Sequence, residues 1–234
     1  MGLADLHMHS IYSYDGTASV TAILKHAKRI GLDVIAITDH DEIAGSLKAL
    51  EIAPNYGVEI IPGTEVTTAE GDLLALNVTE KIERHRPLIE TVLAVRELGG
   101  FCIAPHPMAG GFGMKSLNAY SILKALRNSE VASTLIAIET YNATTIDKMS
   151  NHYARILADR LDIAQTASSD AHILEAIGLG ATEFDGHTAQ DLINALHKRD
   201  VHQRKQKEWN SAYILGSWAT HYVGSAFTRL ANAA

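Results

Sequence analysis

Apolar residues recur at two different periods along the chain, and the period changes repeatedly. Short apolar runs predict buried strands over residues 34–38, 58–66, 73–78, 101–104, 135–139 and 163–167. Apolar residues three and four positions apart predict helices over 17–30, 43–53, 87–98, 117–127, 146–160 and 188–199. Thr17 or Ser19 and Thr188 can cap two of these helices, and Gly31 ends the first. Because strands and helices alternate, the pattern predicts a parallel barrel or an open α/β sheet.

Length and composition favour a single domain. The chain has 234 residues, of which 47% are hydrophobic and 20% charged, enough for one substantial core. We expect a catalytic barrel over residues 1–199 and a C-terminal helical extension over 200–234 that packs on it. The apolar stretch 209–230 is interrupted by Asn210, His221 and Arg229, so we expect a packing helix and no membrane span.

Charge and cysteine usage narrow the class of protein. The net charge of −7 argues against a surface for nonspecific nucleic-acid binding, although a local basic groove remains possible. The lone cysteine, Cys102, lies in an apolar run and is interpreted as a packed thiol in a reducing compartment. A polar motif begins at Asp5, which leaves no room for a signal-type leader. We therefore expect a cytoplasmic protein.

The segment Asp5-Leu6-His7-Met8-His9-Ser10 carries the first candidate chemistry. Side chains two positions apart on a strand point to the same face, so His7 and His9 can bind one metal ion together. Asp15 follows this pair and could be a further ligand or only part of a turn with Gly16.

Four later segments place a histidine or carboxylate directly after an apolar run. They are Thr38-Asp39-His40-Asp41, Pro62-Gly63-Thr64-Glu65, Pro105-His106-Pro107 and Ser168-Ser169-Asp170-Ala171-His172. Active sites of α/β barrels assemble at the carboxyl ends of buried parallel strands, so these side chains are expected to converge. Asp39 and Asp41 could orient His40 or cap the next helix, and capping is the favoured role for Asp41.

These ordered motifs, from residue 3 to residue 199, resemble those of the PHP family, the polymerase and histidinol phosphatase superfamily of metal-dependent phosphoesterases. The resemblance implies a distorted (β/α)7 TIM-like barrel with metal ions at the carboxyl ends of its strands. It also implies two or three divalent ions, for which imidazole and carboxylate ligands suit Mn, Zn or Fe.

The resemblance carries metal ligands over to matching positions. A first ion would take His7, His9, Glu65 and Asp170, and Glu65 would bridge to a second ion that also takes His106. A third ion would take Asp15, His40 and His172. For the second ion, many relatives have a Gly-His pair where this chain has Gly71-Asp72. Asp72 can still ligate through oxygen, but an anion in place of an imidazole shifts the preference toward Mn or Mg-like ions.

Two residues are predicted to contact the substrate. Lys115, in the Gly-rich segment 108–116, could hold a substrate phosphate, although this segment could equally be a plain connecting loop. Asn142, at a strand end, could line the pocket or could equally be a packing or turn-forming asparagine. A basic cluster of Lys198, Arg199, Arg204, Lys205 and Lys207 is interpreted as a solvated run, so nucleic acid is possible but not favoured.

The leading hypothesis is a hydrolase that cleaves phosphate esters of a nucleotide, small metabolite or short oligonucleotide by attack of metal-bound hydroxide, without a side-chain nucleophile. Within enzymes the alternative is a histidinol-phosphate phosphatase. From another class, the chain could be a non-catalytic metal-binding regulatory domain, although a structural ion needs only about four ligands. Hydrolysis of a non-phosphate bond also remains open, because barrels with metal sites support several reactions.

Overall fold

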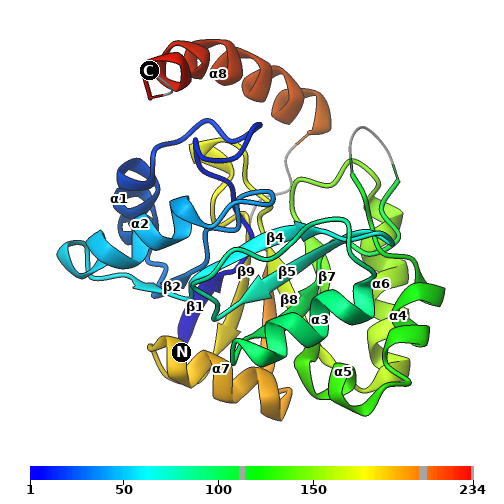
Figure 1. Ribbon diagram of the computed structural model, residues 1–234. Helices are drawn as coiled ribbons and strands as arrows, with labels where there is room; N and C mark the ends of the chain where they lie inside the picture. Colours follow the sequence, from blue (N-terminus) through cyan, green and yellow to red (C-terminus); the bar gives the residue numbers. More distant parts are fainter. Residues whose placement is uncertain (111–113, 206–209, 233–234) are drawn as a thin grey trace.

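The computed structural model describes residues 1–110, 114–205 and 210–232 (Figure 1). The strands are β1 (Gly2–Asp5), β2 (Val34–Ile35), β3 (Glu59–Ile60), β4 (Gly63–Thr67), β5 (Asp72–Leu76), β6 (Phe101–Ala104), β7 (Leu135–Asn142), β8 (Ala164–Ser168), β9 (Gly180–Phe184) and β10 (Val201–Lys205). The α-helices are α1 (Val20–Ile30), α2 (Ala44–Ile52), α3 (Leu88–Glu97), α4 (Ala119–Ala125), α5 (Ser129–Thr134), α6 (Lys148–Leu161), α7 (Ala189–Lys198) and α8 (Ser211–Asn232). Short 3-10 helices cover Ala53–Asn55 and Leu174–Ala176.

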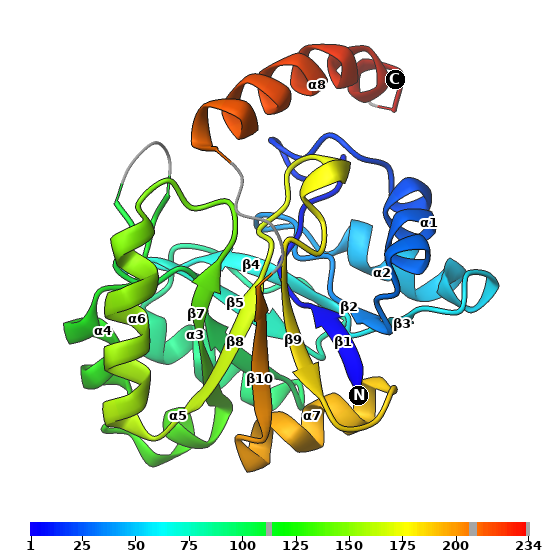
Figure 2. The ribbon, with the colours of Figure 1, turned by 180° about the vertical axis from the view of Figure 1, so that it is seen from behind.

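The strands form two mixed five-stranded sheets. The first has the order β10-β9-β1-β2-β3, with β1, β2 and β3 parallel and β9 and β10 antiparallel to their neighbours. The second has the order β4-β5-β6-β7-β8, in which β4, β5 and β6 are antiparallel and β6, β7 and β8 are parallel. In Figure 2, β8 runs beside β10 and β9, and the Thr182 hydroxyl of β9 donates to the Ala167 carbonyl of β8 over 3.0 Å.

The expected α/β class is confirmed, but a closed (β/α)7 barrel is not: within the described residues the ladders define two separate sheets. Two features account for the difference. The predicted strand over 58–66 is split into β3 and β4, and β3 ends one sheet while β4 begins the other. The antiparallel strands β5, β9 and β10 also break the regular βα repeat that a barrel needs.

Local sequence signals account for most element boundaries. The Ser19 side chain accepts a hydrogen bond from the Ala22 amide at the start of α1, and Gly31, with φ 79°, ends that helix as predicted. Thr188 and Asp191 form a capping box at the start of α7. The predicted strands over 58–66 and 73–78 contain β4 and β5, which form an antiparallel pair from Gly63 with Leu76 to Thr67 with Asp72.

The segment after residue 199 is not entirely helical. Residues 201–205 form β10, which pairs with β9, and α8 begins only at Ser211. Figures 1 and 2 show α8 lying across the end of the molecule opposite the N-terminus. Trp209, at the start of the predicted packing helix, and Lys207, in the basic cluster, lie outside the described residues. Residues 111–113 of the Gly-rich segment also lie outside them. Among the helices that the structure describes, none is long and apolar enough to cross a bilayer.

Candidate metal centre

The candidate site lies where the carboxyl ends of β1 and β8 meet. His7 and His9 follow β1, and Asp170 and His172 follow β8. The Asp170 amide donates to the His7 carbonyl over 2.8 Å, and the His9 amide donates to the Ala171 carbonyl over 2.9 Å. These backbone bonds hold together two motifs that are more than 150 residues apart in the sequence.

Glu65, on β4, is the centre of the arrangement and is fully buried. Its Oε2 lies 3.2 Å from Nε2 of His7, 3.2 Å from Nδ1 of His40 and 3.4 Å from Nε2 of His9. Its Oε1 lies 3.1 Å from Nε2 of His106. Four imidazoles therefore converge on one carboxylate, a geometry suited to a carboxylate shared between cations.

The ligand atoms gather into three overlapping groups, within each of which they lie no more than 4.8 Å apart. The groups are His7, His9 and Asp170; His7, Glu65 and His106; and His9, Asp15, His40 and His172. Sequence reasoning placed eight of its nine candidate ligands among these residues, and the structure brings all eight together. Whether each binds a metal ion remains a prediction.

Asp72, the ninth candidate, lies beside these groups rather than within them. It lines the same cavity as Glu65 and His106, and its buried Oδ1 has no hydrogen-bond partner among the described residues. Burial, together with the charge of Glu65, raises the pKa of Asp72 to about 7. An unpartnered carboxylate oxygen beside Glu65 fits a position that completes the shell of a divalent cation.

The electrostatics of the cluster also favour bound cations. Burial lowers the pKa of His7, but the charges of Asp170, Glu65 and Glu139 outweigh burial and raise the pKa well above its usual value. For Glu65, burial raises the pKa, yet the neighbouring His40 and His7 hold it well below the usual range. Burial and the neighbouring His172 and His40 lower the pKa of His9 to about 4, which leaves its imidazole neutral, as a metal ligand requires. The mixed imidazole and carboxylate set therefore fits a divalent transition metal.

Glu139 is a site residue that sequence reasoning missed. It is fully buried on β7, and its Oε1 lies 3.2 Å from Nδ1 of His7. Its Oε2 accepts hydrogen bonds from the His106 amide over 2.8 Å and from Nδ2 of Asn142 over 2.9 Å. A carboxylate on the far nitrogen of a ligating histidine fixes the orientation of its ring. The only sequence signal was an acidic residue at the end of an apolar strand.

Neither of the two predicted substrate contacts is among the residues that line the cavity. Asn142 is fully buried, donates to Asp170 Oδ2 over 3.0 Å as well as to Glu139, and accepts from the amides of Thr144 and Thr145. These contacts favour a positioning role for Asn142. Lys115 has an exposed side chain outside the cavity lining, and its carbonyl accepts from the Asp72 amide over 2.5 Å.

The roles expected for Asp39 and Asp41 also need correction. Asp39 is buried and accepts hydrogen bonds from the amide of Ser10 over 2.6 Å and from its hydroxyl over 2.7 Å, so it fixes the loop after His9. Asp41 accepts from the Thr67 amide over 2.8 Å and does not cap α2. Glu42 is instead the residue whose carboxylate lies at the start of α2. It accepts hydrogen bonds from the amide of Ile43, just before the helix, and from that of Ala44, its first residue.

A cavity of about 390 Å³ opens onto the cluster. It is lined by Tyr14, Asp15, His40, Glu65, Asp72, His106, Met114, Thr144, Ile146, Asp170, His172, Ile173, Ala176, Leu215 and Trp218. This volume lies within the roughly 300–1,000 Å³ of small-molecule sites. Its lining combines the candidate metal ligands, here called its floor, with apolar side chains, here called its wall, which makes it the candidate active site.

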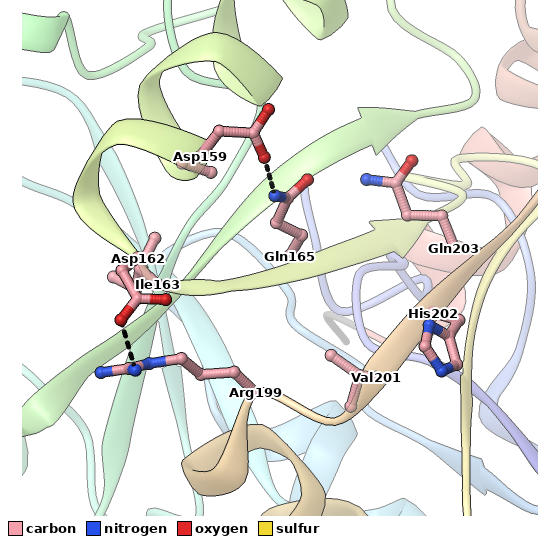
Figure 3. Close-up of a pocket in the computed structure, with 9 residues that line it drawn as sticks. Asp159, Asp162, Ile163, Gln165, Arg199, Val201, His202 and Gln203 are labelled. Carbon is pink, nitrogen blue, oxygen red and sulfur yellow. Dashed lines mark hydrogen bonds and ion pairs between the residues drawn. The ribbon is translucent and has the colours of Figure 1, made fainter.

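A larger hollow of about 620 Å³, shown in Figure 3, lies between α6, β8 and β10. Its charged groups are already paired, because Arg199 bonds to Asp162 over 2.6 Å. Gln165 likewise donates to Asp159 over 2.5 Å. No group of three potential metal ligands among the described residues lies there. Arg199 and Arg204 are exposed and face carboxylates. Residues 201–205 nevertheless form β10, so this part of the basic cluster is a paired strand and not an irregular solvated run.

Comparisons with known proteins agree with this geometry. The sequence profile of the PHP domain matches residues 5–214. An uncharacterised protein of Methanocaldococcus jannaschii is 34% identical over 161 residues, which cover 64% of this chain and 88% of the relative. A 5'-3' exoribonuclease of Haemophilus influenzae is 30% identical over 196 residues, which cover 82% of this chain and 62% of the relative.

Among solved structures, a two-domain protein of Bacteroides vulgatus containing a predicted PHP-like metal-dependent phosphoesterase superimposes with a TM-score of 0.69. The match covers 87% of this chain and 64% of the other at 18% identity, so it speaks for the fold alone. The profile match spans the five motifs that supply the clustered ligands. The chain belongs to the PHP domain family.

Proposed function

We propose that this protein is a metal-dependent hydrolase of phosphate esters, acting on nucleotides, small phosphorylated metabolites or short oligonucleotides. One observation carries the proposal: four imidazoles converge on the buried carboxylate of Glu65 at the floor of a cavity large enough for a small molecule. A merely structural ion needs about four ligands in a closed shell, whereas this site has nine candidate ligands and an opening.

We assign one ion to His7, His9, Glu65 and Asp170, a second to Glu65, Asp72 and His106, and a third to Asp15, His40 and His172. Mn, Zn and Fe are the ions that this ligand set suits. When bound, such ions make a water molecule more acidic and neutralise charge on phosphoryl oxygens, the two requirements of phosphate ester hydrolysis.

The protein groups around the cluster prepare it for this chemistry. Nδ1 of His7 faces Glu139. In the neutral imidazole, the form that binds a metal ion, a proton on Nδ1 would leave the lone pair of Nε2 directed toward Glu65 and Asp170. His106, with φ 28°, and Asp170, with φ 53°, adopt left-handed backbone conformations that are uncommon for residues other than glycine. Such uncommon backbone conformations cluster at functional sites.

The exoribonuclease of Haemophilus influenzae supports a second candidate within the same chemistry, the release of nucleotides from the end of a short oligonucleotide. The two candidates differ in the bond that is cleaved, which is the phosphate monoester of a nucleotide or metabolite in one case and a phosphodiester between nucleotides in the other. A substrate panel separates them.

The test begins with metal content and turnover. Purified protein should contain more than one equivalent of transition metal per chain, and about one or none would contradict the multinuclear assignment. The panel contains p-nitrophenyl phosphate, its bis ester, nucleoside monophosphates, histidinol phosphate and short oligonucleotides, each with Mn, Zn or Fe. Preferential turnover of histidinol phosphate would establish the alternative phosphatase.

Ligand variants complete the test. His9→Asn and Asp170→Asn should abolish turnover while the protein stays folded, because each removes a ligand of the first ion. His152→Asn, at an exposed histidine of α6, is the matched control and should keep full activity. Bound metal without turnover of any ester would replace the hydrolase proposal with a non-catalytic metal-binding domain.

A further inference from the structure

The lining of the candidate active-site cavity contains two chemically different sets of residues. The floor is the set of histidines and carboxylates of the candidate metal centre. The wall is the apolar set, which consists of Met114, Ile146, Ile173, Ala176, Leu215 and Trp218. A phosphate group belongs at the floor, so the rest of a bound ester would face the apolar wall.

Helix α8 supplies two residues of this wall, Leu215 and Trp218. Nε1 of Trp218 donates a hydrogen bond over 2.9 Å to the carbonyl of Asp15, a candidate metal ligand. Figures 1 and 2 both show α8 lying across the end of the molecule opposite the N-terminus. The PHP profile ends at residue 214, so this part of the wall lies just beyond the region that the family shares.

The wall remains accessible to a ligand. Leu215 is 46% exposed and Ile146 is 44% exposed, although both line the cavity. The Trp218 ring is half-buried and is tilted by 31° to the ring of Tyr222. Tyr14, which also lines the cavity, stacks on His40 with ring centroids 5.0 Å apart. Burying such apolar surface against a ligand is favourable at roughly 25 cal/mol per Å².

We propose, on the basis of the phosphoesterase function above, that α8 forms a binding subsite for a flat aromatic group, with Trp218 as the specificity-determining residue. The preferred substrates are then nucleoside or aryl phosphates of single-residue size. Aromatic rings offer a sequence-tolerant face for stacking on tryptophan. A sugar or glycerol phosphate would instead place hydroxyl groups against Leu215, Ile146 and Trp218, where their lost hydration has no compensating partner.

The size of the cavity supports single-residue substrates. Its volume of about 390 Å³ lies near the lower end of the range for small-molecule sites. Trp218 and Asp15 are joined by a hydrogen bond and both line the cavity, so this part of the wall stands directly beside the metal centre. The cavity volume suits a phosphate and one ring system.

The first experiment measures selectivity in the full-length, metal-loaded protein. The quantity is kcat/KM for adenosine 5'-monophosphate divided by kcat/KM for glycerol 3-phosphate. Trp218→Ala should lower this ratio about tenfold to a hundredfold, the range expected for loss of one base–aromatic stack. Trp218→Phe keeps a ring and should keep most of the ratio. Val223→Ala, at an exposed α8 residue outside the cavity lining, should leave the ratio unchanged.

The second experiment measures binding without turnover. The chain has two tryptophans, so a Trp209→Phe protein reports Trp218 fluorescence alone. The probe is the phosphonate analogue of adenosine 5'-monophosphate in which a methylene replaces the ester oxygen, and inorganic phosphate is the reference. The analogue should change the emission at a concentration at least tenfold lower than phosphate does.

The outcomes separate this inference from the proposed function. An unchanged selectivity ratio in Trp218→Ala, or equal responses to the analogue and to phosphate, would overturn the aromatic subsite even if turnover is high. A selective fluorescence response without turnover of any ester would support the subsite and overturn the hydrolase proposal.

Discussion

Replacing Glu139 by glutamine tests whether this buried residue orients the metal ligands. Three donors converge on its two oxygens: Nδ1 of His7 at 3.2 Å from Oε1, and the His106 amide and Nδ2 of Asn142 at 2.8 and 2.9 Å from Oε2. Glutamine has the same shape but only one oxygen, and its amide group donates. It cannot satisfy all three donors in either orientation.

The less costly orientation of the introduced glutamine keeps its oxygen toward His106 and Asn142, because two donors lie on that side. Its NH₂ group then faces Nδ1 of His7. The imidazole must either lose its hydrogen bond or move its proton to Nε2, the nitrogen that faces Glu65 and Asp170. A lost hydrogen bond to a charged group costs about 1.5–3 kcal/mol. Removing a carboxylate behind a ligating histidine lowers metal affinity about 10–100-fold, and that loss corresponds to about 1.4–2.7 kcal/mol, so the two estimates agree.

The assay is competition between the protein and a chelator of known affinity, with bound metal measured directly. Glu139→Gln should show affinity about 10–100-fold weaker for the most tightly bound ion, with an unchanged circular dichroism spectrum. Glu97→Gln, at an exposed position of α3, is the matched control. Metal affinity of Glu139→Gln within twofold of the unmodified protein would refute the orienting role.

Four further predictions follow from the same geometry. Removing metal with a chelator should lower the melting temperature, since an ion present at a thousand times its dissociation constant stabilises the fold by about 4 kcal/mol; an unchanged melting curve would contradict bound structural ions. Asp72→His should raise the affinity for Zn relative to Mn, because imidazole replaces a hard oxygen ligand; competition titrations with both ions measure the ratio. Gly16→Ala should destabilise the loop before α1, because the added Cβ would lie 2.0 Å from the Ser10 carbonyl oxygen. A denaturant titration should show a free energy of unfolding that is lower by well over the roughly 0.5 kcal/mol typical of surface changes. Cys102 should react with a disulfide reagent only after denaturation, because it is fully buried and burial raises the pKa of its thiol; rapid labelling of native protein would argue against this packing.

Sequence reasoning located the candidate ligands because their motifs follow apolar runs. The His7 and His9 pair obeys the two-residue period of extended chain, and helix caps such as Ser19 are local signals. In each case the structural outcome depends on residues close together in the sequence.

Long-range pairing explains what the sequence did not predict. Strand β10 has the sequence VHQRK and looks like a solvated basic run, yet it pairs with β9 and completes the first sheet. Glu139 became a site residue only because β7 lies beside β6, which leads to His106. Trp218 joins the cavity from a position 203 residues after Asp15. No local pattern encodes these neighbours.

The overlap of the three ligand groups implies that the proposed ions do not bind independently. His7 belongs to two groups and His9 belongs to two, and Glu65 faces four imidazoles through its two oxygens. An ion bound by His7, His9 and Asp170 would hold the rings of His7 and His9, which also belong to the other two groups. Less side-chain entropy would then be lost when the next ion binds. The same ion repels the next one, since two divalent charges a few ångströms apart interact strongly even when partly screened. Glu65 is assigned to the first and the second ion, and its buried carboxylate would offset that repulsion. Loss of Glu65 should therefore weaken the binding of both ions rather than one. We therefore expect no other residue to substitute for Glu65, whereas Asp72, which lies beside the ligand groups, is expected to tune the choice of ion.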